Sequence, residues 1–239
     1  MVTNVQRLRL FLAGASDVNP ERKIVHEVVE SWNRGAGQQR GWRVDVFDYT
    51  KNVAPRYGGD GQKIINEAAG NMRSYAFFVG ITKHRFGTPT PRAPSGTVEE
   101  FRRAVRAYQS TGRLQIMLYF SDASLPAPHT KEKLQQKTKV MDFRKQVQSK
   151  SFYIPYPGEA EFRRLFSEHF AGSMEKQIKV AVAAKRRAAA LGSANKIKPA
   201  TRRPAKTAAR PKAAGASKPK ASPKPTRKAP ARVSTTKAK

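Results

Sequence analysis

The segment Ser95-Gly96-Thr97-Val98-Glu99-Glu100-Phe101 combines two carboxylates with hydroxyl groups and a glycine where a helix is expected to begin. A carboxylate held there could stabilise or trap the oxocarbenium-like centre that forms when an N-glycosidic bond breaks. The spacing of Thr97 and Glu100 also fits a capping box, in which each side chain accepts a hydrogen bond from the other residue's backbone N–H. Spacing alone favours the capping box over the catalytic role.

Further polar residues are expected at the carboxyl ends of the strands, where open α/β sheets bind their ligands. Ser16 and Asp17 follow the first expected strand and could bind a ribose or a phosphate, although Asp17 fits a turn or cap equally well. Arg22 could pair with Asp17 and brace that loop. Asp48 follows the second expected strand and is a candidate ribose ligand. Arg85 could reach a phosphate or remain a solvated loop charge.

Several other kinds of site lack support in the sequence. The chain has no cysteine, which excludes disulfides and cysteine-based zinc sites. The four histidines are scattered without metal-ligand pairing, and no serine lies in a Gly-x-Ser-x-Gly elbow. The glycine-rich run 58–63 lacks the Walker spacing, and Gly14-Ala15-Ser16 lacks the dinucleotide fingerprint. We therefore expect no metal and no resident cofactor.

Alternating apolar patterns predict the elements that would position these residues. Strands are expected at residues 7–13, 42–47, 75–81, 114–120 and 152–154. A first helix is expected with Asn19 as cap and Pro20 in its first turn, ending at Gly35 and Gly37. Further helices are expected at residues 63–72, 97–108 and 131–148, and from Glu159 into the start of the C-terminal segment. The alternation predicts an α/β fold with a flavodoxin-like parallel sheet of about five strands and helices on both faces.

Five motifs occur in an order that resembles one recurrent bacterial pattern. They are Phe11-Leu12-Ala13-Gly14-Ala15-Ser16-Asp17, Glu21-Arg22, Phe78-Val79-Gly80-Ile81, Arg85-Phe86-Gly87 and Ser95-Gly96-Thr97-x-x-Glu100-Phe101. The pattern is similar to that of an uncharacterised bacterial domain-of-unknown-function family with a Ser-Gly-Thr-x-x-Glu-Phe signature. That family often stands at the N-terminus of signalling and defence proteins, and it resembles TIR domains and nucleoside 2-deoxyribosyltransferases. The resemblance covers roughly residues 7–122.

The resemblance implies a TIR-like domain with a nucleotide ligand. It makes Glu100 the candidate catalytic carboxylate, with Glu99 facing elsewhere, and Ser95, Gly96 and Thr97 part of the binding segment. The implied activity is that of an N-glycosyl hydrolase, with NAD or a nucleoside as substrate. Nicotinamide leaves a cation as a neutral molecule, so one carboxylate could suffice without a general acid. Family members usually carry an acidic residue before the third strand, where this chain has Arg73-Ser74-Tyr75.

A second function remains open on the same motifs. The domain could be a non-catalytic TIR-like module that binds a nucleotide or a protein partner, including a second copy of itself as a homo-oligomer. Turnover of a nucleotide would distinguish the enzyme from this binding module.

The C-terminal segment 185–239 differs sharply in charge from the rest of the chain. The net charge is +30, all 17 acidic residues lie between Asp17 and Glu175, and residues 185–239 contain 18 Lys and Arg. The large apolar residues of this segment are Leu191, Ile197 and Val233. Ordering a backbone costs about 1–2 kcal/mol per residue, which so few apolar side chains cannot offset. We therefore predict a folded domain at 1–184 and a disordered tail at 185–239.

The predicted tail suits contacts with nucleic-acid phosphates. Such contacts carry no base information, and the segment has no aromatic residue to stack on bases, so binding without sequence preference is expected. Its composition resembles the Lys/Ala/Pro tails of linker histones and bacterial histone-like proteins. A tail that merely improves solubility is the alternative. The candidate phosphate contacts are Lys185, Arg186, Arg187, Arg202, Arg203, Lys218, Lys220, Lys224, Arg227 and Lys228.

The N-terminal residues contain only a short apolar run, which predicts neither a signal peptide nor a membrane span. No window approaches the roughly 20 apolar residues that a transmembrane helix needs. We expect a cytoplasmic protein with no membrane partner, and association with the nucleoid would fit the tail.

Overall fold

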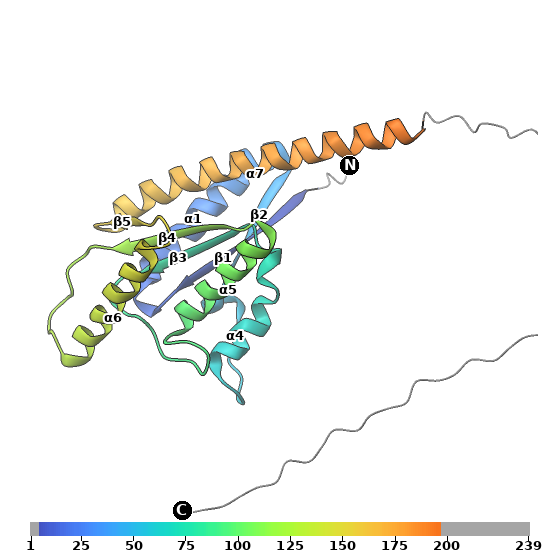
Figure 1. The fold of residues 1–239 in the computed structure, drawn as a ribbon. Coiled ribbons are helices and arrows are strands. Elements are labelled where there is room, and N and C mark those ends of the chain that lie inside the picture. The colour runs from blue at the N-terminus through green and yellow to red at the C-terminus, as the bar shows by residue number, and fades with distance from the viewer. Residues whose placement is uncertain (1–4, 197–239) are drawn as a thin grey trace, which may run out of the picture. The chain divides into compact units, whose positions relative to one another are not determined.

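Five parallel strands alternate with helices over residues 5–196, the part of the chain that the computed structural model describes (Figure 1). The strands are β1 (Gln6–Gly14), β2 (Trp42–Asp48), β3 (Phe77–Thr82), β4 (Gln115–Ser121) and β5 (Ile154–Tyr156). They lie in the order β2-β1-β3-β4-β5, and every neighbouring pair is parallel. This is the flavodoxin-like order, so the predicted fold class is confirmed.

Helices cover both faces of the sheet. The longer ones are α1 (Asn19–Trp32), α4 (Gly61–Ala69), α5 (Gly96–Thr111), α6 (Lys131–Gln148) and α7 (Glu159–Lys196). Short helical segments are η1 (Ser16–Val18), η2 (Asn33–Gly37), α2 (Gln38–Arg40), α3 (Tyr49–Asn52) and η3 (Met72–Ser74). The helices α1 and α7 lie on one face, and α4, α5 and α6 lie on the other (Figure 1). All six residues of β3 are buried, as expected for a central strand covered on both sides.

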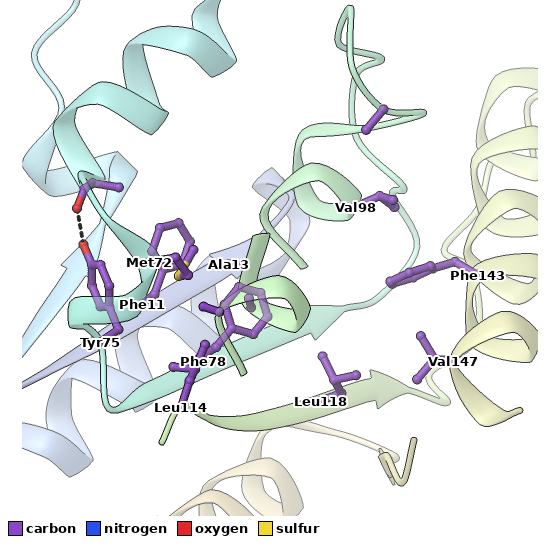
Figure 2. Close-up of a cluster of buried hydrophobic side chains, with 14 of the residues drawn as sticks. Phe11, Ala13, Met72, Tyr75, Phe78, Val98, Leu114, Leu118, Phe143 and Val147 are labelled. Carbon is purple, nitrogen blue, oxygen red and sulfur yellow. Dashed lines mark hydrogen bonds between the residues drawn. The ribbon is translucent and has the colours of Figure 1, made fainter. Parts of the chain in front are cut away.

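Each face of the sheet has its own apolar core. On the α4–α5–α6 side, Phe11, Phe78 and Leu118 belong to one buried cluster with Phe143 (Figure 2). The Tyr75 hydroxyl in this cluster donates a hydrogen bond of 2.9 Å to the backbone carbonyl of Ala69, so its polar end is satisfied. Two cores on opposite faces hold the sheet between them and fix the ends of its strands.

On the α1–α7 side, α7 presents aromatic residues one helical turn apart. The rings of Phe162, Phe166 and Phe170 stack with centroid separations of 5.9 and 5.7 Å. All three side chains are buried. This ladder packs against Phe77 of β3 and Tyr119 of β4. The four-residue spacing that predicted this helix therefore marks the face that contacts the sheet.

The first helix differs from its prediction at both ends. Val18, rather than Asn19, occupies the N-cap position, and Pro20 lies in the first turn as expected. Gly35 kinks the helical path but neither Gly35 nor Gly37 ends it, because η2 and α2 follow and the left-handed Gly41 terminates them. Contacts with residues distant in the sequence therefore continue the helical path, although the two glycines favour its termination.

Two such contacts hold the kinked segment in place. The Asn33 side chain donates to the Val44 carbonyl at 2.9 Å and accepts from the Val44 amide at 2.8 Å. A Cβ at residue 37 would lie 2.6 Å from the Trp32 ring, so Gly37 is required for this close packing rather than for helix termination.

The fifth strand pairs with only part of its neighbour. β5 contacts Tyr119, Phe120 and Ser121 of β4, so within residues 5–196 the segment 115–118 has a strand neighbour on the β3 side alone. The predicted strand at 152–154 is thus displaced toward the C-terminus by two residues.

The last helix extends to Lys196, into the segment predicted as the basic tail. Arg186 and Arg187 are exposed on it. The side chain of Lys185, the predicted phosphate contacts from Arg202 to Lys228, and the predicted disorder beyond residue 196 lie outside what the structure describes. Among the helices described, none combines the length and apolar character needed to cross a membrane.

Candidate functional site

A cavity of about 200 Å³ opens at the carboxyl ends of β1 and β3, where the strand order reverses direction. This switch point is where open α/β sheets bind ligands. Its walls come from the end of β1, the starts of α3, α4 and α5, and the loop after β3. The lining residues are Gly14, Ala15, Ser16, Tyr49, Gln62, Ile65, Arg85, Gly87, Thr88, Gly96, Thr97 and Glu100.

Glu100 is the buried carboxylate of this cavity, with only 3% of its surface exposed. Its Oε1 atom accepts a hydrogen bond of 2.9 Å from Nε2 of Gln62. The predicted capping box with Thr97 is wrong, because Ser95 occupies the N-cap of α5 and its Oγ accepts from the Val98 amide at 3.2 Å. The Glu100 side chain therefore bonds across to α4 rather than back to its own helix terminus.

Burial raises the pKa of Glu100 to about 7. The hydrogen bond from Gln62 and the charges of Arg22 and Arg103 act in the opposite direction but do not cancel the cost of desolvation. Near neutral pH, Glu100 is therefore present in both ionised and protonated forms. A titration in this range is typical of groups that take part in chemistry.

Glu99 is buried too, but its carboxylate is fully engaged outside the cavity. It accepts from Arg92 Nε at 2.7 Å, from Thr90 Oγ1 at 2.7 Å and from Asn66 Nδ2 at 2.6 Å. Burial opposes its ionisation, but these partners outweigh burial and lower the pKa of Glu99. The two adjacent carboxylates thus have different surroundings, and Glu100 is the one at the cavity.

Arg22 lies behind the cavity and pairs with Asp48, not with Asp17 as predicted. Its Nη1 atom is 2.7 Å from Asp48 Oδ1, and Nη2 donates to the Gly14 carbonyl. Asp48 is fully buried and also contacts His26 at 3.1 Å. The ion pair forms because the parallel pairing of β1 with β2 brings the end of β2 beside α1. Arg22 and Asp48 are 26 positions apart in the sequence, so the sequence does not reveal that they are close. Arg22 still braces the loop, through Gly14.

Asp17 also acts on a loop rather than at the cavity surface. Its Oδ2 atom accepts from the backbone amides of His84 and Arg85, at 2.7 and 2.8 Å. The segment after β3 is thereby held against the segment after β1. Arg85 reaches back through Nη1 to the hydroxyl of Ser16 at 2.9 Å, and both residues line the cavity.

Five of the predicted site residues therefore meet at one cavity, and four lie behind it. Those at the cavity are Ser16, Arg85, Gly96, Thr97 and Glu100. Those behind it are Asp17, Arg22, Asp48 and Ser95, each of which forms at least one hydrogen bond or ion pair within the protein. Among the described residues, no cluster of His, Asp and Glu could hold a metal ion.

Sequence reasoning missed three polar residues of the cavity: Tyr49, Gln62 and Thr88. Tyr49 directly follows β2 and lies under the Arg22 guanidinium, 4.9 Å from the ring centroid, so its position after a strand was the available signal. Gln62 lies in the glycine-rich run 58–63, which has no phosphate-binding spacing, and nothing local marks it. Its role depends on a contact with a residue 38 positions away.

Three solved structures show a distant similarity to this chain. The apo translation elongation factor SelB from Methanococcus maripaludis shares 13% identity and a TM-score of 0.41, over 72% of this chain and 35% of that chain. Oxidised flavodoxin 1 from Bacillus cereus shares 13% identity and a TM-score of 0.35, over 71% and 98%. Homoserine dehydrogenase from S. aureus shares 12% identity and a TM-score of 0.26, over 63% and 33%.

The chain spans about a third of the length of the elongation factor and of the dehydrogenase. At these identities and scores the similarities carry no argument about function. No curated protein matches the chain. Residues 55–171 match a family model described as Domain of unknown function (DUF4062), a range that includes Gln62, Arg85 and Glu100 of the cavity.

Proposed function

We propose that this domain binds a nucleotide in the switch-point cavity and cleaves its N-glycosidic bond with the help of Glu100. The observation that carries the proposal is a buried carboxylate, 3% exposed, at a cavity where α/β sheets bind ligands. The relationship to TIR and deoxyribosyltransferase-like domains, suggested by the Ser-Gly-Thr-x-x-Glu-Phe segment, supports the same reaction and the same residue.

The chemistry requires one ionised carboxylate. When the bond between ribose C1′ and a pyridinium nitrogen breaks, its electron pair leaves with nicotinamide, which departs neutral. Positive charge then develops at C1′ and the ring oxygen, and the Glu100 carboxylate stabilises or traps it. A water molecule adds to C1′ and loses its proton to solvent. Because the ionised form acts, the activity should rise with pH through the Glu100 pKa of about 7 and then level off.

The remaining lining residues suit a ribose and its phosphate. Gly96 and Thr97 lie in the first turn of α5, a 16-residue helix whose N-terminus favours anions. The Arg85 guanidinium and the Ser16 hydroxyl stand together on the opposite loops. At about 200 Å³ the cavity is smaller than the roughly 300–1,000 Å³ of drug-sized pockets, so a ribosyl phosphate would fill it and the rest of a dinucleotide would extend outward.

The test is nicotinamide release from NAD by the full chain and by two matched variants. Wild type should release nicotinamide, and Glu100→Gln should be slower by roughly 100-fold or more, since it loses the charge that stabilises the transition state. Glu99→Gln, which changes the neighbouring carboxylate outside the cavity, should remain active. Equal release by wild type and Glu100→Gln would overturn the assignment. If NAD is inert, release of free base from nucleosides and nucleoside monophosphates tests the same bond.

A non-catalytic nucleotide-binding module is the second candidate. The observation that favours it is the raised pKa of Glu100, because a protonated carboxyl donates a hydrogen bond to a ligand but cannot act as a nucleophile. Calorimetric binding of a nucleotide without product formation would support the module over the enzyme. No thermal shift across a nucleotide panel would count against both.

We also propose that the basic C-terminal segment binds nucleic acid without sequence preference and keeps the domain close to it. The support is compositional, namely 18 Lys and Arg and no acidic residue in 185–239. The nucleoid is the location that this proposal implies.

A further inference from the structure

The side-chain amide of Gln62 lies against Glu100 where α4 and α5 meet, and several contacts hold the helix turn that carries Gln62. Asp60 caps α4, and its Oδ1 atom accepts a hydrogen bond of 2.9 Å from the backbone N–H of Gln62. Its Oδ2 atom is 2.8 Å from Arg92 Nη2, and the same guanidinium binds Glu99 of α5. The start of α4, where Gln62 lies, is therefore tied to Glu99 in the first turn of α5, next to Glu100.

The orientation of the Gln62 amide follows from its neighbours. Its Nε2 atom donates to Glu100 Oε1 at 2.9 Å and lies 3.5 Å from Asn66 Oδ1. Asn66 Oδ1 must be an acceptor, since Arg103 donates to it, and Asn66 Nδ2 donates to Glu99. Both groups that face Nε2 accept hydrogen bonds, so the NH₂ end of Gln62 points to them and its carbonyl oxygen points the other way.

That carbonyl oxygen lies over Gly96. A Cβ at residue 96 would overlap Gln62 Oε1 and lie 3.2 Å from its Cδ. The backbone of Gly96 does not have a positive φ, so the absence of a side chain matters for space and not for conformation. A side chain at residue 96 would therefore displace the amide from Glu100.

We propose, on the basis of the function proposed above, that Gln62 is a positioning residue for Glu100 and that Gly96 provides the space for it. The amide occupies Oε1, which leaves Oε2 as the oxygen for the ligand. A neutral donor also favours the ionised carboxylate without adding a charge that would compete for it. The glycine of the Ser-Gly-Thr segment then acts on catalysis through a residue of another helix.

The test is a titration of the Glu100 carboxyl by ¹³C NMR of the full chain labelled at glutamate, with the resonance assigned by its loss in Glu100→Gln. Gln62→Ala removes the donor and should raise the Glu100 pKa by about half a unit or more. Gly96→Ala, whose new methyl group would meet the Gln62 side-chain amide first, should raise it similarly. Gly61→Ala is the matched control: it is also in a helix first turn, has open space around its Cβ position, and should leave the titration unchanged.

The double variant Gln62→Ala/Gly96→Ala separates this mechanism from general damage. Once residue 62 is alanine, a methyl group at residue 96 has no amide to displace, so the double variant should titrate like Gln62→Ala alone. Additive shifts, or an unchanged titration in Gly96→Ala, would overturn the proposal. Circular dichroism spectra should show that each variant is folded.

The titration needs no turnover, so its failure differs from failure of the proposed function. If turnover is found, the acid limb of the kcat/KM profile should move with the Glu100 pKa in Gln62→Ala and Gly96→Ala. A shifted titration without turnover in wild type would support the positioning role and reject the hydrolase. Turnover with an unshifted titration would reject the positioning role alone.

Discussion

Glu100 and Asp48 are both buried carboxylates near one end of the sheet, yet their surroundings drive their pKa values apart. Burial opposes ionisation of Asp48, but His26, Arg22 and Thr50 outweigh burial and lower its pKa. Glu100 has one direct neutral donor, Gln62, and its pKa is raised to about 7. The fold thus stabilises the charge of Asp48 and makes that of Glu100 costly, a contrast that supports the role proposed for Glu100.

Because ionising the buried Glu100 carboxyl is unfavourable, the stability of the Glu100→Gln variant should depend on pH differently from that of wild type. The folded-state pKa of Glu100 lies above its ordinary value of 4.5, so the folded protein holds that proton more tightly. The stability gained from protonation is present below about pH 4.5 and is lost as pH rises through about 7. Because the glutamine side chain of the variant cannot ionise, its free energy of unfolding relative to wild type should rise by about 2–3 kcal/mol from pH 5 to pH 8.

Urea denaturation of both proteins at the two pH values measures this difference, in which all other titrating groups cancel. Glu99→Gln is the control, because the pKa shift of Glu99 has the opposite sign. The pKa of Glu99 is lowered below its ordinary value of 4.5, so its ionised form stabilises the fold, and that stability is lost only as pH falls below about 4.5. Between pH 5 and pH 8 the stability of the variant relative to wild type should therefore stay nearly level or fall slightly. The same pH trend in both variants would contradict the assignment of the raised pKa to Glu100.

For single residues, the sequence predicted which side chains lie at the site better than it predicted which side chains bond to one another. Ser16 and Arg85 were predicted at the site from their positions after strands, which are local signals, whereas Glu100 was predicted from the resemblance of its segment to a family signature. The partner of Arg22 and the hydrogen bond from Gln62 to Glu100 were not predictable, because they join residues 26 and 38 positions apart. Local spacing offered Thr97 as a cap, whereas the structure uses Ser95.

Among the elements, α7 shows how a strictly local pattern builds one face of the core. Its aromatic residues recur every fourth position, and the ladder Phe162, Phe166 and Phe170 contacts the central strands. Phe166 in the middle of the ladder is fully buried. This helix therefore supplies three of the six buried aromatic side chains in the core of the α1–α7 face.

Phe166→Ala should destabilise the fold by about 3–5 kcal/mol, since it removes a large buried side chain and leaves a cavity between two stacked neighbours. The midpoint of urea denaturation, followed by far-ultraviolet circular dichroism, measures the change. Phe152→Ala is the control: this side chain is 83% exposed, so its removal should alter stability by no more than about 0.5 kcal/mol. Equal effects would show that the ladder is not a core element.

Strands and helices were predictable to within a few residues because their periodicity is local. β3 and α6 were recognised from an apolar run and a polar helix pattern, and α6 has the predicted bounds. The end of the first helix was not predictable. Gly35 and Gly37 favour termination, but the bonds from Asn33 to Val44 carry the helical path on to Gly41.

For the whole molecule, the dominant feature is charge. The chain carries +30, and residues 197–239, beyond the described part, contain 14 of its Lys and Arg. Lys and Arg bound to phosphates release counterions, which makes affinity depend steeply on salt. A chain of this composition should bind DNA and RNA alike, with little regard to base sequence.

Truncation after Lys196 tests the role of this segment. If about eight of its charges neutralise phosphates, the full chain should bind duplex DNA with a slope near −7 in a plot of log affinity against log salt, and truncation should flatten the slope. Fluorescence anisotropy with two unrelated DNA sequences measures both slope and preference. A flat response in the full chain, or the same slope after truncation, would contradict the proposal, and an unchanged circular dichroism spectrum would confirm that the truncated domain is folded.

The short pairing between β4 and β5 bears on how the protein behaves when concentrated. A strand edge with free backbone donors and acceptors is a template on which another chain can grow. Repulsion between molecules of charge +30 opposes that growth. The repulsion shortens in range from about 10 Å at 0.1 M salt to about 3 Å at 1 M. Colloidal stability should therefore be greatest in dilute buffer, and concentrated salt should favour edge-to-edge association, both at residues 115–118 and along β2, which pairs with β1 alone among the described strands.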